Sequence, residues 1–439
     1  MIRVAHFSDL HYAGATLPEV DRCFSFAVDA AIARGVDCAV ISGDSTDHAL
    51  EVHAPAVDAL ARNIRRLADH CPVLMLQGTF SHEPPGALNL FRLLGGRFRV
   101  HVADRLQQVA LMEDGCWRES HGWRFEQIPP GARAVFSCVP TVNKAVVAAA
   151  VGATEAAAAV GEQLTTLLRG FARINEAARA AGVPTIGLSH GTVYGCVTEH
   201  GVPMAGFDHE FTAGSLFGAG AQAFLLGHIH KHQSWEQDGR VIAYAGSIGR
   251  LHYGEQGDKG FLIWEVDAAS VRFELIATPA KRTVEISFDG MPRLEELQQI
   301  ARTNDVTGTF VRVRWTMPEE DRHEVDRSAI QGIFGTAAEV KLEGRVLPVV
   351  RTRAAGISQE ATIAAKIAVW ARLTEGRAEP LLACLEALQT RAPEEIAANI
   401  MERAIEAPGA IPAAAESDTD ALAETTADAA ALPLLVEAP

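Results

Sequence analysis

The chain has 439 residues, of which 48% are hydrophobic and 21% are charged, and its formal net charge at pH 7 is −16. This length predicts two or three domains, and this composition is typical of a globular protein with a large core, not of a fibrous or disordered chain. The chain has no run of about 18 apolar residues, so no membrane-spanning segment is expected.

The negative charge lies partly at the C-terminal end, because residues 404–439 contain seven acidic residues and no Lys or Arg. Net charge therefore does not exclude a polyanionic ligand, which metal ions and a local basic patch would attract. The seven Cys residues form no CxxC pair, which predicts reduced thiols. The N-terminus runs directly into a predicted strand instead of a signal peptide, so a cytoplasmic protein is expected.

The first hundred residues are predicted to alternate between strands and helices. Apolar runs predict strands at 2–7, 38–42 and 73–77, and apolar residues at helical spacing predict helices at 18–34 and 53–70. Such alternation predicts parallel strands joined by right-handed crossovers.

The next 180 residues are predicted to complete a two-sheet domain. An Ala-rich stretch at 143–182 predicts a surface layer of one or two helices. Further strands are predicted at 185–189 and 223–226, and then in a β-rich region at 241–245, 260–266 and 271–276. This strand-rich second half predicts a second sheet packed on the first.

The composition changes near residue 280, where a new unit is predicted to begin. Residues 281–350 are expected to form a small α+β module of three strands and two helices. Residues 351–403 are expected to form helices, with one apolar stripe made of Ile363, Ile367, Trp370 and Leu373. The tail at 404–439 is rich in Ala, Pro, Thr and acids and is expected to be disordered.

Five of the predicted strands end in, or are soon followed by, Asp or His residues. In chain order these are Asp9 and His11, Asp44 and Asp47, His82, His190, and His228 and His230. The carboxyl ends of strands in an α/β sheet lie at one rim, where ligands bind. Mixed carboxylate and imidazole ligands suit Mn²⁺, Fe²⁺ or Zn²⁺ better than Ca²⁺. A single such His is more often structural, but the whole set predicts a site in which two divalent ions clamp a phosphate.

These motifs also match a known family. Asp9-Leu10-His11, Gly43-Asp44 with Asp47, Ser81-His82-Glu83, Ser189-His190 and Gly227-His228-Ile229-His230, in this order, resemble the calcineurin-like metallophosphoesterases. Residues 244–247 and 254–261 look like the DNA-repair exonuclease branch, which includes the nuclease component of the SbcCD complex.

The resemblance implies a fold and a domain order. The fold is an α/β sandwich, in which two β-sheets are flanked by helices as in the metallophosphoesterases. A catalytic domain is expected at 1–280 and a small α+β capping domain at 281–350. C-terminal helices at 351–403 and the acidic tail at 404–439 follow.

The resemblance also assigns roles to residues. One ion takes Asp9, His11, Asp44 and His230. The other ion takes Asp44 as a bridge, together with Ser81, His190 and His228. His82 becomes the catalytic histidine, and Asp47 becomes the carboxylate that orients it, a pairing expected to keep His82 protonated.

One loop departs from the family pattern, which has Asn-His-Asp or Asn-His-Glu after the Gly. Here Ser81 stands at the Asn position, and two extra residues separate Gly78 from His82. A Ser hydroxyl is a poorer metal ligand than an amide oxygen. We therefore expect either that the second ion binds weakly or that Glu83 serves as an additional ligand.

The predicted function is a DNA exonuclease or endonuclease that uses two divalent metal ions, Mn²⁺ first, with Mg²⁺, Fe²⁺ and Zn²⁺ as alternatives. The resemblance implies DNA as substrate, a role in repair or recombination, a coiled-coil ATPase partner similar to SbcC, and a homodimer. Two alternatives stay open: a small-molecule or nucleotide phosphodiesterase or phosphatase, and a DNA-binding scaffold subunit with a weakened second metal site. The apolar stripe at 363–373 fits docking on the partner and packing on the protein's own core equally well.

Overall fold

A computed structural model describes the chain except for residues 95, 142–152, 199–210, 256, 349–355 and 407–439. The chain divides into two compact units, Met1–Leu347 and Pro348–Pro439. The part of the predicted disordered tail beyond residue 406 lies outside the described residues. No helix in the described ranges has the length and hydropathy needed to cross a bilayer.

The first unit contains a six-stranded sheet in the order β13-β12-β1-β2-β3-β4. Its strands are β1 (Ile2–Phe7), β2 (Cys38–Ile41), β3 (Val73–Leu76), β4 (Val100–Ala103), β12 (Gly260–Val266) and β13 (Val271–Ala277). Strands β1 to β4 are parallel, as the alternation of strands and helices predicts. The prediction that placed 260–266 and 271–276 in the second sheet is wrong, because β12 pairs antiparallel with β1 and β13 pairs with β12.

A second sheet of seven strands has the order β10-β11-β9-β8-β7-β5-β6. Its strands are β5 (Gln107–Met112), β6 (Trp117–Glu119), β7 (Ala132–Val139), β8 (Thr185–His190), β9 (Ala223–Gly227), β10 (Gln233–Gln237) and β11 (Arg240–Tyr244). The four central strands β7, β8, β9 and β11 are parallel. Their carboxyl ends therefore lie along one edge of the sheet.

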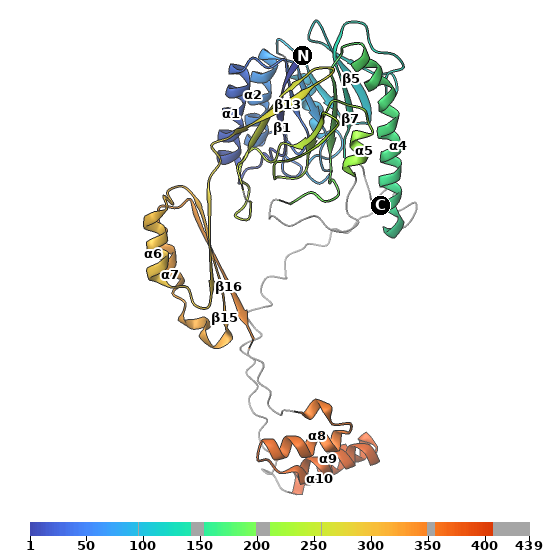
Figure 1. Ribbon diagram of the computed structural model, residues 1–439. Coiled ribbons are helices and arrows are strands. Elements are labelled where there is room, and N and C mark those ends of the chain that lie inside the picture. The colour runs from blue at the N-terminus through green and yellow to red at the C-terminus, as the bar shows by residue number, and fades with distance from the viewer. Residues whose placement is uncertain (95, 142–152, 199–210, 256, 349–355, 407–439) are drawn as a thin grey trace. The chain divides into compact units, whose positions relative to one another are not determined.

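The two sheets pack face to face between two helical layers (Figure 1). Helices α1 (Leu17–Ala33) and α2 (Pro55–His70) bury their apolar faces against the first sheet. Helices α4 (Ala153–Ala180) and α5 (Ala213–Phe217) cover the second sheet. Fully buried residues of both sheets, such as Phe136, Leu188 and Trp264, fill the space between them. The predicted fold class, two β-sheets flanked by helices, is confirmed.

The end of the first unit is a small parallel sheet in the order β14-β15-β16. Its elements are β14 (Thr283–Asp289), α6 (Leu294–Thr303), β15 (Phe310–Pro318), the 3₁₀ turn Glu319–Glu324, α7 (Arg327–Ile333) and β16 (Glu339–Leu347). Alternate residues of β15, including Val311, Val313 and Trp315, are buried with apolar residues of the two helices. This segment is called the small module below.

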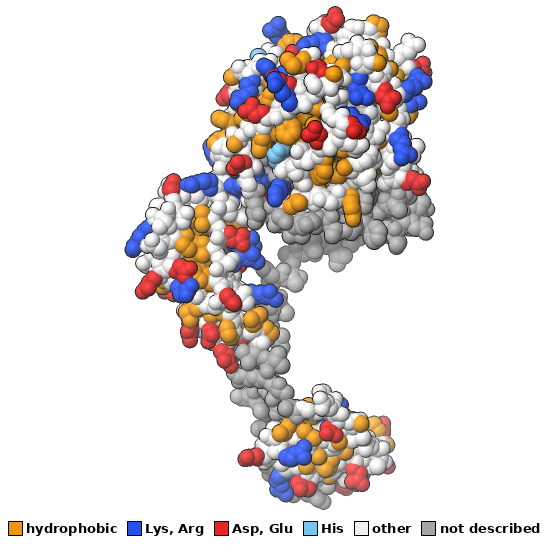
Figure 2. All heavy atoms as spheres, viewed as in Figure 1, with side chains coloured by type: hydrophobic (Ala, Val, Ile, Leu, Met, Phe, Trp, Pro, Cys, Tyr) orange, Lys and Arg blue, Asp and Glu red, His pale blue; other side chains and the backbone are white. Residues whose placement is uncertain are grey.

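The second unit consists of the helices α8 (Ile363–Leu373), α9 (Ala378–Thr390) and α10 (Pro393–Glu406), preceded by a 3₁₀ turn at Ile357–Gln359. Among its described residues only Ala371 is buried. Three members of the predicted stripe, Ile363, Trp370 and Leu373, are exposed, and Figure 2 shows hydrophobic side chains on the surface of these helices. The described residues of the second unit therefore do not cover this apolar stripe.

Candidate metal centre

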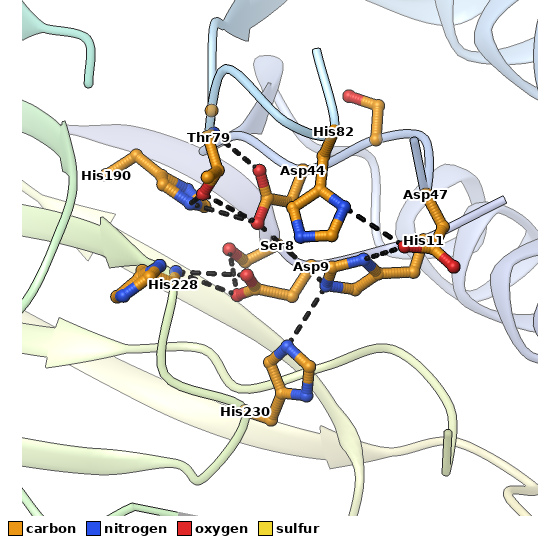
Figure 3. Close-up of polar contacts among 12 residues, drawn as sticks. Ser8, Asp9, His11, Asp44, Asp47, Thr79, His82, His190, His228 and His230 are labelled. Atoms are coloured by element: carbon orange, nitrogen blue, oxygen red, sulfur yellow. Dashed lines mark hydrogen bonds and ion pairs between the residues drawn. The ribbon is translucent and has the colours of Figure 1, made fainter. Parts of the chain in front are cut away.

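The carboxyl ends of the central strands of both sheets bring the predicted site residues together (Figure 3). Asp9 and His11 follow β1, Asp44 follows β2, His190 ends β8, and His228 and His230 follow β9. The two sheets are joined here directly. His190 Nδ1 lies 2.8 Å from the Ser42 carbonyl oxygen, and the His228 N–H donates to both oxygens of Asp9 at 3.0 and 3.1 Å.

The described side chains form four groups of possible metal ligands, in each of which the donor atoms lie within 4.8 Å of one another. Two of them consist of predicted ligands: one is Asp9, His11 and His230, and the other is Asp44, His190 and His228. The other two include His82, once with His11 and Asp44 and once with Asp47 and His48. Asp44 lies between the two groups of predicted ligands, because its Oδ2 is 3.2 Å from His190 Nε2 and 4.0 Å from His11 Nε2. These two groups contain every ligand that the resemblance implies except Ser81.

The chemistry of these donors fits bound cations. His11 Nε2 and His230 Nε2 lie 3.0 Å apart, so a proton or a metal ion must separate their lone pairs. Burial alone lowers the pKa of His190, but the carboxylates of Asp44 and Asp9 raise it to about 10. The site therefore stabilises positive charge strongly, and divalent ions would take the place of such protons.

The backbone at the predicted ligands is in an unfavourable conformation. Of seven non-glycine residues with positive φ in the described part of the chain, four are predicted ligands: Asp9 (49°), His11 (48°), Asp44 (51°) and His228 (103°). Positive φ is uncommon outside glycine and concentrates at functional sites, where the surrounding structure enforces it. The fold thus holds these side chains in place against local strain.

Three glycines allow the loops of the site to pack closely against the ligands. Gly43 follows β2, Gly78 follows β3, and Gly227 ends β9. A Cβ atom on Gly43 would overlap the His190 ring, and one on Gly78 would overlap Asp44. A Cβ atom on Gly227 would overlap Ser8 and the Ser42 backbone. Any side chain at these positions would displace a ligand or its neighbours.

The structure does not place Ser81 at the second metal site. Residues 79–82 form a turn in which the N–H groups of His82 and Glu83 donate to the Thr79 carbonyl, and the turn leaves the Ser81 side chain exposed. Thr79 takes the expected position instead. Its hydroxyl lies 3.2 Å from both Asp44 Oδ2 and His190 Nε2, and its N–H donates to Asp44 Oδ1 at 2.6 Å.

We expect Thr79→Ala to weaken binding of the second ion, because it removes the hydroxyl that lies between Asp44 and His190 in Figure 3. The dissociation constant should rise about tenfold, the lower end of the range for residues that support metal ligands. Titration with Mn²⁺ by calorimetry measures this effect. Ser81→Ala is the matched control and should leave both ions unaffected. The reverse result would restore the assignment of Ser81.

Glu83 supports the site without facing it. Its buried carboxylate accepts hydrogen bonds from the backbone N–H groups of Ser45 at 2.5 Å and Gly78 at 2.6 Å. It thus holds together the two loops that follow β2 and β3. Burial and the nearby Asp44 raise the pKa of Glu83 to about 7. With both oxygens committed to the backbone, Glu83 is not available as the alternative ligand considered from the sequence.

Replacing Glu83 with alanine should destabilise the first unit by about 2–5 kcal/mol, because two buried N–H groups would lose their acceptor. Urea denaturation followed by tryptophan fluorescence measures this loss. Glu126→Ala, at an exposed position, should change stability by less than about 0.5 kcal/mol. Equal stability of the two variants would show that water satisfies these N–H groups.

His82 lies at the mouth of the site, with its side chain 22% exposed. Its Nδ1 is 3.0 Å from Asp47 Oδ1, which is the contact that the resemblance implies. The expectation that this pairing keeps His82 protonated is wrong for the protein without ions. Burial lowers the pKa of His82, and the neighbouring imidazole of His11 adds to this effect, whereas Asp44 and Asp47 only partly compensate.

The sequence interpretation missed the residue that orients His230. Glu255 Oε1 lies 3.0 Å from His230 Nδ1, and its other oxygen lies 3.0 Å from Lys259 Nζ. Burial would raise the pKa of Glu255, but the hydrogen bond with His230 and the Lys259 ammonium lower it to about 2. A carboxylate behind a ligating histidine fixes its orientation. In the sequence, the Gly-rich loop at 253–260 pointed to a likeness with the DNA-repair exonuclease branch but did not identify Glu255 as the partner of His230.

No family model matches the chain. It is 33% identical over 89 residues to the uncharacterized metallophosphoesterase YhaO of Bacillus subtilis, and this match spans 20% of either chain.

Three solved structures are similar at 11–12% identity. GAP50, the anchor in the inner membrane complex of Plasmodium, matches 63% of this chain and 84% of its own with a TM-score of 0.38. A dimetal phosphatase from Danio rerio matches 62% and 98% with a TM-score of 0.38. A predicted phosphoesterase from Streptococcus pneumoniae matches 63% and 98% with a TM-score of 0.21. The short sequence match thus supports the resemblance to the metallophosphoesterase superfamily.

Proposed function

We propose that this protein is a two-metal phosphoesterase that hydrolyses phosphodiester bonds of DNA. The observation that carries the proposal is the position of Asp44 between two groups of metal-ligating side chains. His82 lies beside them and is accessible from solvent. Such a pair of sites suits a phosphate group, which needs its charge neutralised on both the attacking and the leaving side.

The residues divide the work as follows. Asp9, His11, Asp44 and His230 would hold one ion, and Asp44, His190, His228 and Thr79 the other. Two bound ions would supply positive charge to the phosphate and activate a water molecule as nucleophile. Water attacks phosphorus and loses a proton to solvent, the bond to the leaving oxygen breaks, and protonated His82 gives its proton to that oxygen. The negative phosphodiester raises the pKa of His82 as it binds, so the proton is taken up with the substrate.

Two features favour DNA over a small substrate. The loop that resembles the DNA-repair exonuclease branch supplies Glu255 and Lys259, which pack against His230. The small module adds a sheet face that carries Arg312, Arg314 and Lys341, opposite the apolar face on which its helices α6 and α7 pack. Glu285 and Glu343 pair with these cations, so DNA binding there would require the pairs to open and should be sensitive to salt.

The test is hydrolysis of end-labelled linear duplex DNA in Mn²⁺, with bis(p-nitrophenyl) phosphate as a small diester in parallel. Degradation of DNA by the wild type and not by His82→Ala supports the nuclease. Hydrolysis of the small diester alone would favour a small-molecule phosphodiesterase. If neither substrate is hydrolysed and one ion is bound per chain, the scaffold alternative is favoured. The specific reason to consider it is that the Thr79 hydroxyl lies where the family pattern has an Asn amide, which is the better metal ligand.

We further propose that a coiled-coil ATPase docks on the second unit and that the protein works in the cytoplasm as a homodimer. Ile363, Trp370 and Leu373 are not buried within the second unit, which supports docking over packing inside that unit. The seven cysteines form no disulfide among the described residues, which agrees with a reducing compartment.

Deleting residues 358–403 should abolish binding of the proposed coiled-coil ATPase partner, because it removes the exposed apolar stripe. Co-purification of the two tagged proteins measures this binding. Hydrolysis of the small diester by the deletion variant should be unchanged and serves as the control for folding. Unchanged co-purification would end the docking proposal.

A further inference from the structure

The loop at 250–259 touches the metal centre on one side and the small module on the other. Its Glu255 carboxylate lies 3.0 Å from His230 Nδ1. Two residues earlier, the Tyr253 ring lies 5.1 Å from the ring of Phe310, the first residue of β15. Only one residue separates the two contacts, so this loop connects the module to a predicted metal ligand.

The metal side of the loop has little freedom to move independently. The Glu255 side chain is fully buried, and its Oε2 accepts a hydrogen bond from the Leu251 N–H at 3.0 Å. Lys259 Nζ, 3.0 Å from the same carboxylate, donates to the His230 carbonyl and to Ser247 Oγ, both at 2.9 Å. A displacement of the loop would therefore be transmitted to both the ring and the backbone of His230.

The module side is held by aromatic and cationic contacts. Lys281 Nζ lies 4.9 Å from the Phe310 ring, and Lys341 Nζ, on β16, lies 5.8 Å from the Tyr253 ring, both within range of a cation–π interaction. Arg250 donates from one guanidinium to the Gly257 carbonyl and to the Lys281 carbonyl. The start of the module and the loop are thus fixed to each other.

We propose that Tyr253 and Phe310 are positioning residues for His230, through which the small module sets the affinity of the first metal ion. The inference rests on the proposed function, because it takes His230 as a metal ligand. A DNA segment that binds the module and shifts it would change metal affinity, and by reciprocity metal binding would change the affinity of the module for DNA.

The test is calorimetric titration of the full chain with Mn²⁺ in the absence of substrate. Phe310→Ala and Tyr253→Ala should each raise the dissociation constant of one of the two ions about tenfold, as expected when support for a ligand is lost. Tyr253→Phe keeps the ring and should bind as the wild type does. Met291→Ala removes an exposed apolar side chain from the same module and is the matched control.

The double variant Tyr253→Ala/Phe310→Ala should be weakened by less than the sum of the two single effects, because both substitutions remove the contact between the two rings and each also removes one contact with a lysine. Additive effects, or equal weakening of both ions, would overturn the coupling. Unchanged affinity in Phe310→Ala, with two ions bound by the wild type, would overturn the coupling and leave the proposed function intact. A wild type that binds no Mn²⁺ would overturn the proposed function itself. If Phe310→Ala does not fold, Tyr253→Ala decides the question from the loop side.

Discussion

His82→Ala should reduce turnover of a phosphodiester by about 10³-fold while two metal ions stay bound, as expected when a general acid is removed. The Nδ1 atom of His82 lies 3.0 Å from Asp47, and His82 belongs to neither ligand set that the resemblance implies, although it lies within ligand distance of His11 and Asp44. Its loss should therefore remove the proton for the leaving oxygen and leave the ions in place. Steady-state kinetics and metal analysis of the same preparation measure both effects.

His48→Ala is the matched control for this substitution. The His48 ring stacks on His82 with centroids 5.4 Å apart, but its side chain is 76% exposed. Its removal should change turnover by less than about threefold, as expected for an exposed residue without a direct role. Loss of metal together with activity in His82→Ala would refute the catalytic role and indicate a ligand instead.

Asp44→Asn should eliminate binding of both ions and, with them, all measurable hydrolysis. Asp44 Oδ2 faces His190 at 3.2 Å and His11 at 4.0 Å, so one carboxylate serves both groups of ligands. The substitution keeps the size of the side chain, and Asn tolerates the positive φ of 51° at this position. The expected loss therefore reflects the missing charge, not a disturbed backbone.

Asp9→Asn provides the comparison, because Asp9 belongs to only one of the two groups. Its metal content should fall from two ions to one, whereas that of Asp44→Asn should fall to none. Inductively coupled plasma mass spectrometry after gel filtration distinguishes these numbers. One ion retained by Asp44→Asn would show that this residue does not bridge the sites.

The sequence predicts the position of most site residues because strand ends and metal-ligating residue types are both local features. Asp9, Asp44 and His190 stand directly at or after buried strands, and parallel pairing brings such ends together. Thr79 could not be found in this way. Thr79 lies at the second metal site instead of Ser81 because of the turn at 79–82. Residue types alone do not reveal such a local turn.

The partners of strands were harder to predict than the strands themselves. The segments 260–266 and 271–276 are correctly expected as strands, yet β12 joins β1 across more than 250 residues of chain. Strands β5, β6 and β7 were not expected. Strand β5 begins with Gln107 and Gln108, and β6 is the polar segment Trp117–Glu119, so neither shows the apolar run that predicts β1, β2 and β3. Glu255 was missed as a partner of His230 for a related reason: the contact joins a loop to a distant strand end.

The positive φ angles at Asp9, His11, Asp44 and His228 limit how this backbone can be redesigned. A sequence optimised only for stability would place Gly or Asn at these four positions. Either residue adopts positive φ more easily and would relieve about 1 kcal/mol or more of backbone strain at each position. Such a protein would melt at a higher temperature and would keep only His190, His230 and Thr79 of the proposed metal ligands. Consensus or computational stabilisation should therefore hold these four residues constant and seek its gains at Asp238 and Glu375, which have positive φ but lie outside both groups of ligands.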